Sequence, residues 1–292
     1  MTRAEIIERR DEIVRRSGPW RRHDLRLADG VHTMGAGGAG ETVRVRRIVQ
    51  LVRDFAGGRL RGLRILDLGA GEGGFALELG AQEADVVALE GRAALAEKAE
   101  FAREALGLRR VSIVREDVRR LSVEQHGFFD VVLALRILEH LDAPAVFEVA
   151  KGIASACKGV ALIETRLAPR ARASREFEGV VFRGAPRREH RPNASRPQRL
   201  AMLDRSLDNE HAFLLTRASL MGLLARCGFT SIAETRSPAD DPESPCFAAI
   251  KGRKIALATA PEANALPTEA WPEPRPGVAR RRLAGLLRRS RP

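Results

Sequence analysis

Five short apolar runs alternate with longer amphipathic segments through the middle of the chain. The apolar runs cover residues 65–68, 85–90, 111–114, 129–135 and 160–163. The amphipathic segments repeat their apolar positions at helical spacing over residues 42–55, 93–106 and 143–157. Near-continuous apolar strands that alternate with helices are typical of a parallel sheet covered on both faces. The pattern therefore predicts a doubly wound α/β fold.

Both ends of this pattern are extended by further elements. Residues 4–16 show helical spacing of isoleucine and valine, and with the helix over 42–55 they predict an N-terminal helical cap, residues 1–56. A helix over 216–227 and strands over 230–234 and 246–250 follow late in the chain. With these two strands we expect a mostly parallel, seven-stranded sheet in one domain, residues 57–251.

The periodic pattern breaks after the fifth strand. Residues 166–210 contain four prolines and show little periodicity, so we expect an irregular basic insertion that acts as a lid. Residues 252–292 are rich in Ala, Pro and Arg, a composition that predicts a disordered basic tail.

The positive charge of the chain is concentrated in the same two regions. The formal net charge is +12 over 292 residues. Residues 166–205 hold eleven Arg and four acidic residues, and residues 252–292 hold nine Lys or Arg and three Glu. Two local basic regions indicate either contact with an anionic partner or a solvated surface of an Arg-rich protein.

Cysteine usage and hydropathy predict a cytoplasmic protein. The three cysteines, Cys157, Cys227 and Cys246, are far apart and odd in number, so they form neither a disulfide framework nor a zinc pattern. We expect no metal site. No apolar stretch has the length of a membrane span, and the charged N-terminus lacks the apolar core of a secretory signal.

A glycine-rich turn between the first apolar run and its helix is the main candidate for ligand binding. Gly69, Gly71 and Gly74 fit G-x-G-x-x-G, and Glu90 follows at the distance of a ribose-binding carboxylate. Such a turn brings backbone N–H groups close to a ligand. Taken alone, this pattern fits a nicotinamide-dependent oxidoreductase.

Three features favour a different cofactor. Asp67 lies inside the strand, where its negative charge suits a cationic amino-acid group better than a pyrophosphate. Glu116 and Asp117 follow the third strand and can accept a hydrogen bond from an adenine amino group. The chain also ends with a helix, Gly228-Phe229 and two strands.

The ordered set of motifs resembles the class I S-adenosylmethionine-dependent methyltransferases over about residues 42–251. The motifs are LDLGAGEG (66–73), VVALE (86–90), REDV (115–118), FDVVLALRILEHL (129–141) and LLARCGFTSI (223–232). The resemblance implies a Rossmann-like sheet and S-adenosylmethionine as the cofactor. It places Asp67, Gly69, Gly71 and Gly73 on the methionine side, Glu90 on the ribose hydroxyls, Asp117 on the adenine, and Leu135 and Arg136 beside the sulfur.

A finer likeness connects the chain to the tRNA wobble-uridine (carboxy)methyltransferase branch. It is carried by residues 18–33, 135–144, 161–169 and 213–229. The chain departs from that branch at Arg136, where a small residue is usual, and at Glu139, where a tyrosine is usual.

Methyl transfer to a hydroxyl requires alignment of the acceptor and removal of a proton. His140 follows the fourth strand and is the candidate general base, with a purely structural role as its alternative; Glu139, His190 and His211 compete with it. We expect O-methylation of a small-molecule or glycan acceptor, and the Arg residues of the insertion suit an acidic one.

Three other functions fit parts of the sequence. An RNA-modifying methyltransferase would use the basic regions on phosphates, but aromatic residues make up only 4% of the chain and Tyr is absent, so stacking platforms for bases are few. A nicotinamide-dependent oxidoreductase is disfavoured by Asp67. A cofactor-binding protein without catalysis would act through its basic tail.

Overall fold

The computed structural model describes residues 1–34, 42–235 and 243–252. Residues 1–253 form one compact unit. The tail predicted over residues 252–292 lies outside the described residues from residue 253 onward.

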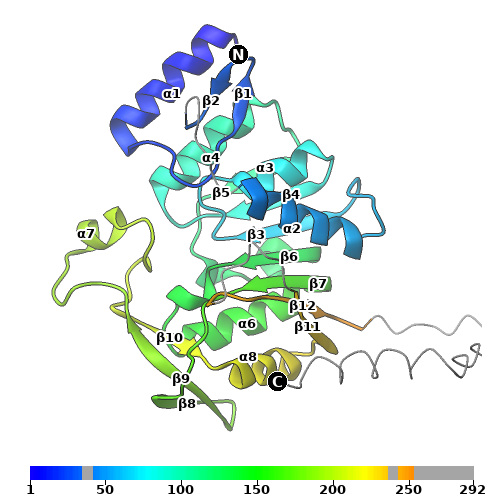
Figure 1. The fold of residues 1–292 in the computed structure, drawn as a ribbon, viewed down its shortest axis with the longest axis vertical. Helices are drawn as coiled ribbons and strands as arrows, with labels where there is room; N and C mark the ends of the chain where they lie inside the picture. Colours follow the sequence, from blue (N-terminus) through cyan, green and yellow to red (C-terminus); the bar gives the residue numbers. More distant parts are fainter. Residues whose placement is uncertain (35–41, 236–242, 253–292) are drawn as a thin grey trace, which may run out of the picture. The chain divides into compact units, whose positions relative to one another are not determined.

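A seven-stranded sheet forms the centre of this unit (Figure 1). Its strands, in spatial order, are β11 (Ser231–Thr235), β12 (Cys246–Ile250), β7 (Cys157–Glu164), β6 (Phe129–Leu135), β3 (Arg64–Leu68), β4 (Asp85–Leu89) and β5 (Val111–Val114). β12 is antiparallel to both of its neighbours, and the pairs from β7 to β5 are parallel. The predicted mostly parallel, seven-stranded sheet is confirmed.

Helices cover both faces of the sheet because the strand side chains alternate between two apolar clusters. Ile65 and Leu66 are both fully buried but belong to opposite clusters. One face packs against α1 (Arg3–Ser17), α2 (Thr42–Phe55), α3 (Gly74–Ala81) and part of α4 (Ala93–Ala105). The other packs against α6 (Ala145–Ala156) and α8 (Arg217–Arg226). The short elements η1 (Val118–Arg120), α5 (Val123–His126) and η2 (Leu138–His140) lie in the connections.

The strand order creates a crevice at one edge of the sheet. The chain runs outward from β3 through β4 to β5 and then returns to the other side of β3 as β6. Leu68 is in register with Leu89 on β4 and Ala134 on β6, so the carboxyl ends of the three strands lie level. Ligands of open α/β sheets bind at such a switch point.

The N-terminal segment is joined to the glycine turn by buried charges. After α1, residues 19–22 pass over the turn, and β1 (Arg26–Ala28) pairs with β2 (Val31–His32). Glu72 accepts hydrogen bonds from the backbone N–H groups of Arg21 and Arg22 at 3.0 Å each. Lys98, fully buried on α4, donates to the carbonyl of Pro19 at 2.8 Å and lies 3.4 Å from Glu72.

The insertion is more regular than the sequence predicts. β8 (Ala173–Phe177), β9 (Val180–Arg188) and β10 (His211–Leu215) form an antiparallel sheet, and α7 (Arg196–Ala201) follows β9 and precedes β10 along the chain (Figure 1). The expectation of an irregular segment was wrong. Phe177 and Phe182 each lie with ring centroids 5.1 Å from Phe147 of α6, so two aromatic residues anchor strands in which half of the other positions are polar.

No helix in the described part of the chain has the length and apolar character of a membrane span.

Candidate functional site

A cavity lies at the carboxyl ends of β3, β4 and β6. Its volume is about 1120 Å³ when the solvent at its mouth is included. Eight residues singled out from the sequence line it together: Asp67, Gly69, Gly71, Glu90, Asp117, Leu135, Arg136 and His140. Segments far apart along the chain therefore meet around one space.

Two glycines give the floor of the cavity its shape. Gly69 and Gly71 have φ values of +68° and +60°, a region that favours glycine. A Cβ at Gly69 would lie 2.7 Å from Cδ1 of Ile137, whereas a Cβ at Gly71 would meet no atom within 4 Å. Gly71 therefore leaves open space for a ligand to approach the backbone.

Gly73, predicted to line the methionine side, is not among the residues that line the cavity. It is the N-cap of α3 with φ +84°, and its N–H donates to the carbonyl of Ala70 at 2.9 Å. A Cβ there would lie 2.9 Å from Cβ of Ala99. The structure gives this glycine a role in the turn and in the packing of α3 against α4.

Asp67 is a buried acid on the cavity wall. It is 1% exposed, and its Oδ2 has no hydrogen-bond partner within the described residues. Burial, with the nearby Glu90 carboxylate as the second cause, raises the pKa of Asp67 to about 7. An unpartnered buried carboxylate oxygen beside a cavity fits a ligand that carries a cationic amine.

Glu90 follows β4 and is held by two backbone amides. The N–H of Gly71 donates to Oε2 and the N–H of Arg92 donates to Oε1, each at 2.8 Å. Burial raises the pKa of Glu90 against the effect of these hydrogen bonds. Each carboxylate oxygen retains a further lone pair, so the group fits two adjacent ligand hydroxyls.

Asp117 lines the cavity, but its carboxylate is already engaged. It caps η1 by accepting from the N–H of Arg119 at 2.9 Å, and the Arg119 guanidinium donates to Asp117 Oδ2. The same guanidinium reaches Asp208 at 2.8 Å. Asp117 thus connects the third-strand loop to the insertion.

Arg92 fastens the insertion over the cavity, a role that the sequence did not reveal. Its buried guanidinium donates to the carbonyl oxygens of Leu200, Met202, Arg205 and Ser206, at 2.6–3.1 Å. Residues 203–207 in turn line the cavity. Beside Arg92, a Cβ at Gly91 would lie 2.6 Å from Leu207.

Glu72 and Lys98 were also missed as supports of the site. Glu72 is 1% exposed and lines the cavity, so the N-terminal segment and the glycine turn share one buried carboxylate. One signal was present in the sequence, because Lys98 occupies the apolar face of its helix between Leu95 and Ala102. A lysine at such a position requires a buried partner.

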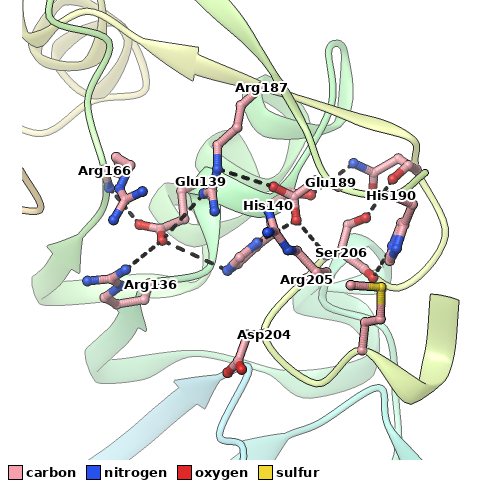
Figure 2. A network of polar contacts seen from close by, with 12 residues as sticks. Arg136, Glu139, His140, Arg166, Arg187, Glu189, His190, Asp204, Arg205 and Ser206 are labelled. Atoms are coloured by element: carbon pink, nitrogen blue, oxygen red, sulfur yellow. Dashed lines mark hydrogen bonds and ion pairs between the residues drawn. The ribbon is translucent and has the colours of Figure 1, made fainter. Parts of the chain in front are cut away.

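His140 is oriented by a buried carboxylate from the insertion (Figure 2). Its Nδ1 lies 2.8 Å from Oε2 of Glu189, which also accepts from the N–H of Ser206 at 2.7 Å. Burial works to raise the pKa of Glu189, but the hydrogen bond and charge of His140, with the Ser206 amide, outweigh it and lower that pKa. An ionised carboxylate only accepts, so Nδ1 of His140 is the donor in this hydrogen bond.

The competing candidates are placed differently. Glu139 is 1% exposed and accepts from the N–H of Arg166 at 2.6 Å and from Arg136 at 3.1 Å, so it acts as a counter-charge. His190 is buried with Nε2 at 2.8 Å from the carbonyl of Ser206, and His211 is exposed; neither lines the cavity.

Within the described residues, no group of three or more His, Cys, Asp or Glu side chains could hold a metal ion.

These features together fit one kind of ligand. An unpartnered buried acid, open space at Gly71 and a carboxylate with spare lone pairs suit the amine, carboxylate and ribose of an adenosyl amino acid.

Comparison with known proteins assigns the family. Residues 40–234 match the family model described as a methyltransferase domain. Two crystal structures of the N-terminal domain of EvdMO1, one with SAH bound and one in the presence of SAH and D-fucose, are each 26% identical with a TM-score of 0.64. The matches cover 87% and 86% of this chain, respectively, and 97% of each domain.

The likeness to the complete EvdMO1 is weaker. That crystal structure is 22% identical with a TM-score of 0.54, and the match covers 86% of this chain but 47% of EvdMO1. No curated protein matches the chain. The family assignment sets aside the nicotinamide alternative: the chain belongs to the class I S-adenosylmethionine-dependent methyltransferases.

Proposed function

We propose that the enzyme transfers a methyl group to a hydroxyl of a small, sugar-like acceptor, with His140 as the general base. The observation that carries this proposal is the pairing of His140 with Glu189 at the edge of the cofactor cavity. A base held by a buried carboxylate suits an acceptor that must lose a proton. The similar EvdMO1 domain was crystallised in the presence of SAH and D-fucose, which supports a sugar as the acceptor class.

The residues that would hold the cofactor follow from the cavity. Asp67 would pair with its ammonium group, the backbone at Gly71 would lie against its amino-acid part, and Glu90 would accept from its ribose hydroxyls. Bound there, the cofactor supplies a methyl group on a positively charged sulfur. These contacts align the donor, and the walls provided by residues 203–207 exclude water.

Proton removal completes the reaction. With the donor bound, the acceptor oxygen would displace sulfur from the methyl carbon, and the electron pair of the broken carbon–sulfur bond would stay on sulfur. The hydroxyl proton passes to Nε2 of His140, and Glu189 stabilises the resulting imidazolium through Nδ1. Oε1 of Glu139 lies 3.9 Å from Nε2 of His140, so the Glu139 carboxylate also stabilises the positive charge of the imidazolium.

The test compares His140→Asn and Glu189→Gln with His211→Asn, an exposed histidine, in transfer from labelled S-adenosylmethionine to neutral and acidic sugars. Loss of a general base should lower kcat by roughly 10²–10⁴-fold in His140→Asn. Glu189→Gln should lower it less and shift the pH–rate profile, while His211→Asn stays at the parent rate.

Binding of S-adenosylhomocysteine should change less than threefold in all three variants, because none of these side chains holds the cofactor. Full transfer by His140→Asn, or a methyl group found on nitrogen or carbon, contradicts the proposal. Methylation of RNA stays a prediction, and the same transfer assay tests it when RNA replaces the sugar.

A further inference from the structure

A second cavity opens beside the first and shares its wall. Its volume is about 630 Å³ with the solvent at its mouth included, and its lining is Arg22, Arg136, Glu139, His140, Arg187, Asp204 and Arg205. Five of these residues also line the cofactor cavity, His140 among them. An acceptor whose hydroxyl meets His140 would therefore extend its remaining atoms into this arginine-rich lobe (Figure 2).

Two of the four arginines already have carboxylate partners at hydrogen-bond distance. Arg22 donates to Asp204 at 2.5 Å, and this pair joins the N-terminal segment to the insertion. Arg136 donates to Glu139 at 3.1 Å. These two cations are largely balanced by charges of the protein.

Arg187 is partnered less completely. Its side chain is 23% exposed, and its Nη1 is buried without a hydrogen-bond partner in the described part of the chain. The carboxylates near it lie at ion-pair distances, Glu139 at 3.9 Å from Nη1 and Glu189 at 3.7 Å from Nε. Buried guanidinium N–H groups are costly to leave unsatisfied, which favours an additional acceptor in the lobe.

Arg205 is the cation with the greatest free capacity. One of its Nη atoms donates to the carbonyl of Arg188 at 3.3 Å, and no carboxylate among the described residues lies within 4.0 Å of its guanidinium. It lines both cavities, so its position is next to the site of methyl transfer. A guanidinium has five donors in a planar fork that matches phosphate and carboxylate oxygens.

We propose that Arg205 and Arg187 form an anion subsite, so that the acceptor is a sugar carrying a phosphate or carboxylate near the methylated hydroxyl. This inference rests on the proposed function and specifies its substrate class. A small anion fits better than a nucleic-acid strand because the lobe, at about 630 Å³ with its mouth included, has the size of a small-molecule pocket.

The test titrates the full-length protein, loaded with S-adenosylhomocysteine, with D-fucose, D-fucose 1-phosphate and D-glucuronate. The two anionic sugars distinguish a phosphate from a carboxylate. We expect at least one of them to bind tenfold or more tightly than D-fucose. Arg205→Gln should abolish most of that advantage, and Arg187→Gln should reduce it.

Arg191→Gln is the matched control, because Arg191 is exposed on the same insertion and does not line the lobe. This variant should bind the anionic sugar as much more tightly than D-fucose as the parent does. No advantage for either anionic sugar, including no detectable binding, overturns the inference, as does an equal loss in Arg191→Gln. Tight, strongly salt-dependent binding of an RNA oligonucleotide in place of the sugars overturns it as well.

The cofactor serves as the internal reference. S-adenosylhomocysteine should bind the parent, Arg187→Gln and Arg191→Gln alike, and thermal unfolding of all four proteins shows that each is folded. If it binds and a neutral sugar is methylated, the proposed function stands and only the anion subsite fails.

Discussion

A single buried acid couples cofactor binding to pH. Asp67 has a pKa of about 7 because it is buried and lies near Glu90, so near neutral pH a large share of the free protein carries it protonated. An ammonium group binds the ionised form. Binding of the cofactor therefore releases a proton, and affinity rises with pH until the carboxyl is ionised in the free protein as well.

With the Asp67 pKa at about 7, we expect the affinity for S-adenosylhomocysteine to increase about fivefold between pH 6 and 7, to reach about tenfold by pH 8, and to level off above that. Calorimetric titrations from pH 6 to 8.5, in two buffers of different ionisation enthalpy, measure both the affinity and the released proton. Asp67→Asn should bind more weakly and lose this step. If the affinity of Asp67→Asn changed with pH as that of the parent does, a group other than Asp67 would be responsible for the pH dependence.

Individual site residues were predictable where their position on a strand end decides their place. Asp67, Glu90 and Leu135 meet because β3, β4 and β6 end level, which follows from the strand pattern. Glu189 and Arg92 could not be found in this way. Their roles depend on the path of the insertion back across the cavity, and that path is set by contacts between distant segments.

Among the elements, the insertion is both a wall and a cover of the site. β9 delivers Glu189 to His140, and the segment after α7 is tied to Arg92. Its strands escaped prediction because arginine, proline and glycine interrupt the apolar positions of β9, while few aromatic side chains carry the packing. The parallel strands were predictable because they are apolar on both faces.

Loss of the Arg92 side chain should loosen this cover. Hydrogen bonds to a charged group contribute about 1.5–3 kcal/mol each, so Arg92→Met should speed dissociation of S-adenosylhomocysteine by roughly tenfold or more. Trypsin should also cleave the variant faster after Arg199 and Arg205. Stopped-flow displacement and mass spectrometry of the fragments provide the two measurements.

Arg109→Met is the comparison variant for this experiment, since Arg109 is exposed beyond the far end of the same helix α4. It should behave as the parent does. Unchanged release and unchanged cleavage in Arg92→Met would mean that the carbonyl contacts do not hold the insertion closed.

In the molecule as a whole, one site is formed by residues of the sheet, the N-terminal segment and the insertion. The sheet supplies the acids and the glycine turn, the N-terminal segment braces that turn through Glu72 and Lys98, and the insertion supplies the partner of the base. The sequence motifs identify the acids of the sheet and the glycine turn. The contributions of the N-terminal segment and the insertion depend on tertiary contacts between charged residues, which the motifs do not contain.

The central claim is that this cavity binds an adenosyl amino acid through Glu90. The most direct measurement is calorimetric titration with S-adenosylmethionine, S-adenosylhomocysteine and NADH of the parent, Glu90→Ala and the exposed control Glu124→Ala. We predict micromolar binding of both adenosyl compounds, on the order of −8 kcal/mol, that is lost only in Glu90→Ala, and no binding of NADH. Tight binding of NADH without binding of either adenosyl compound would contradict the account.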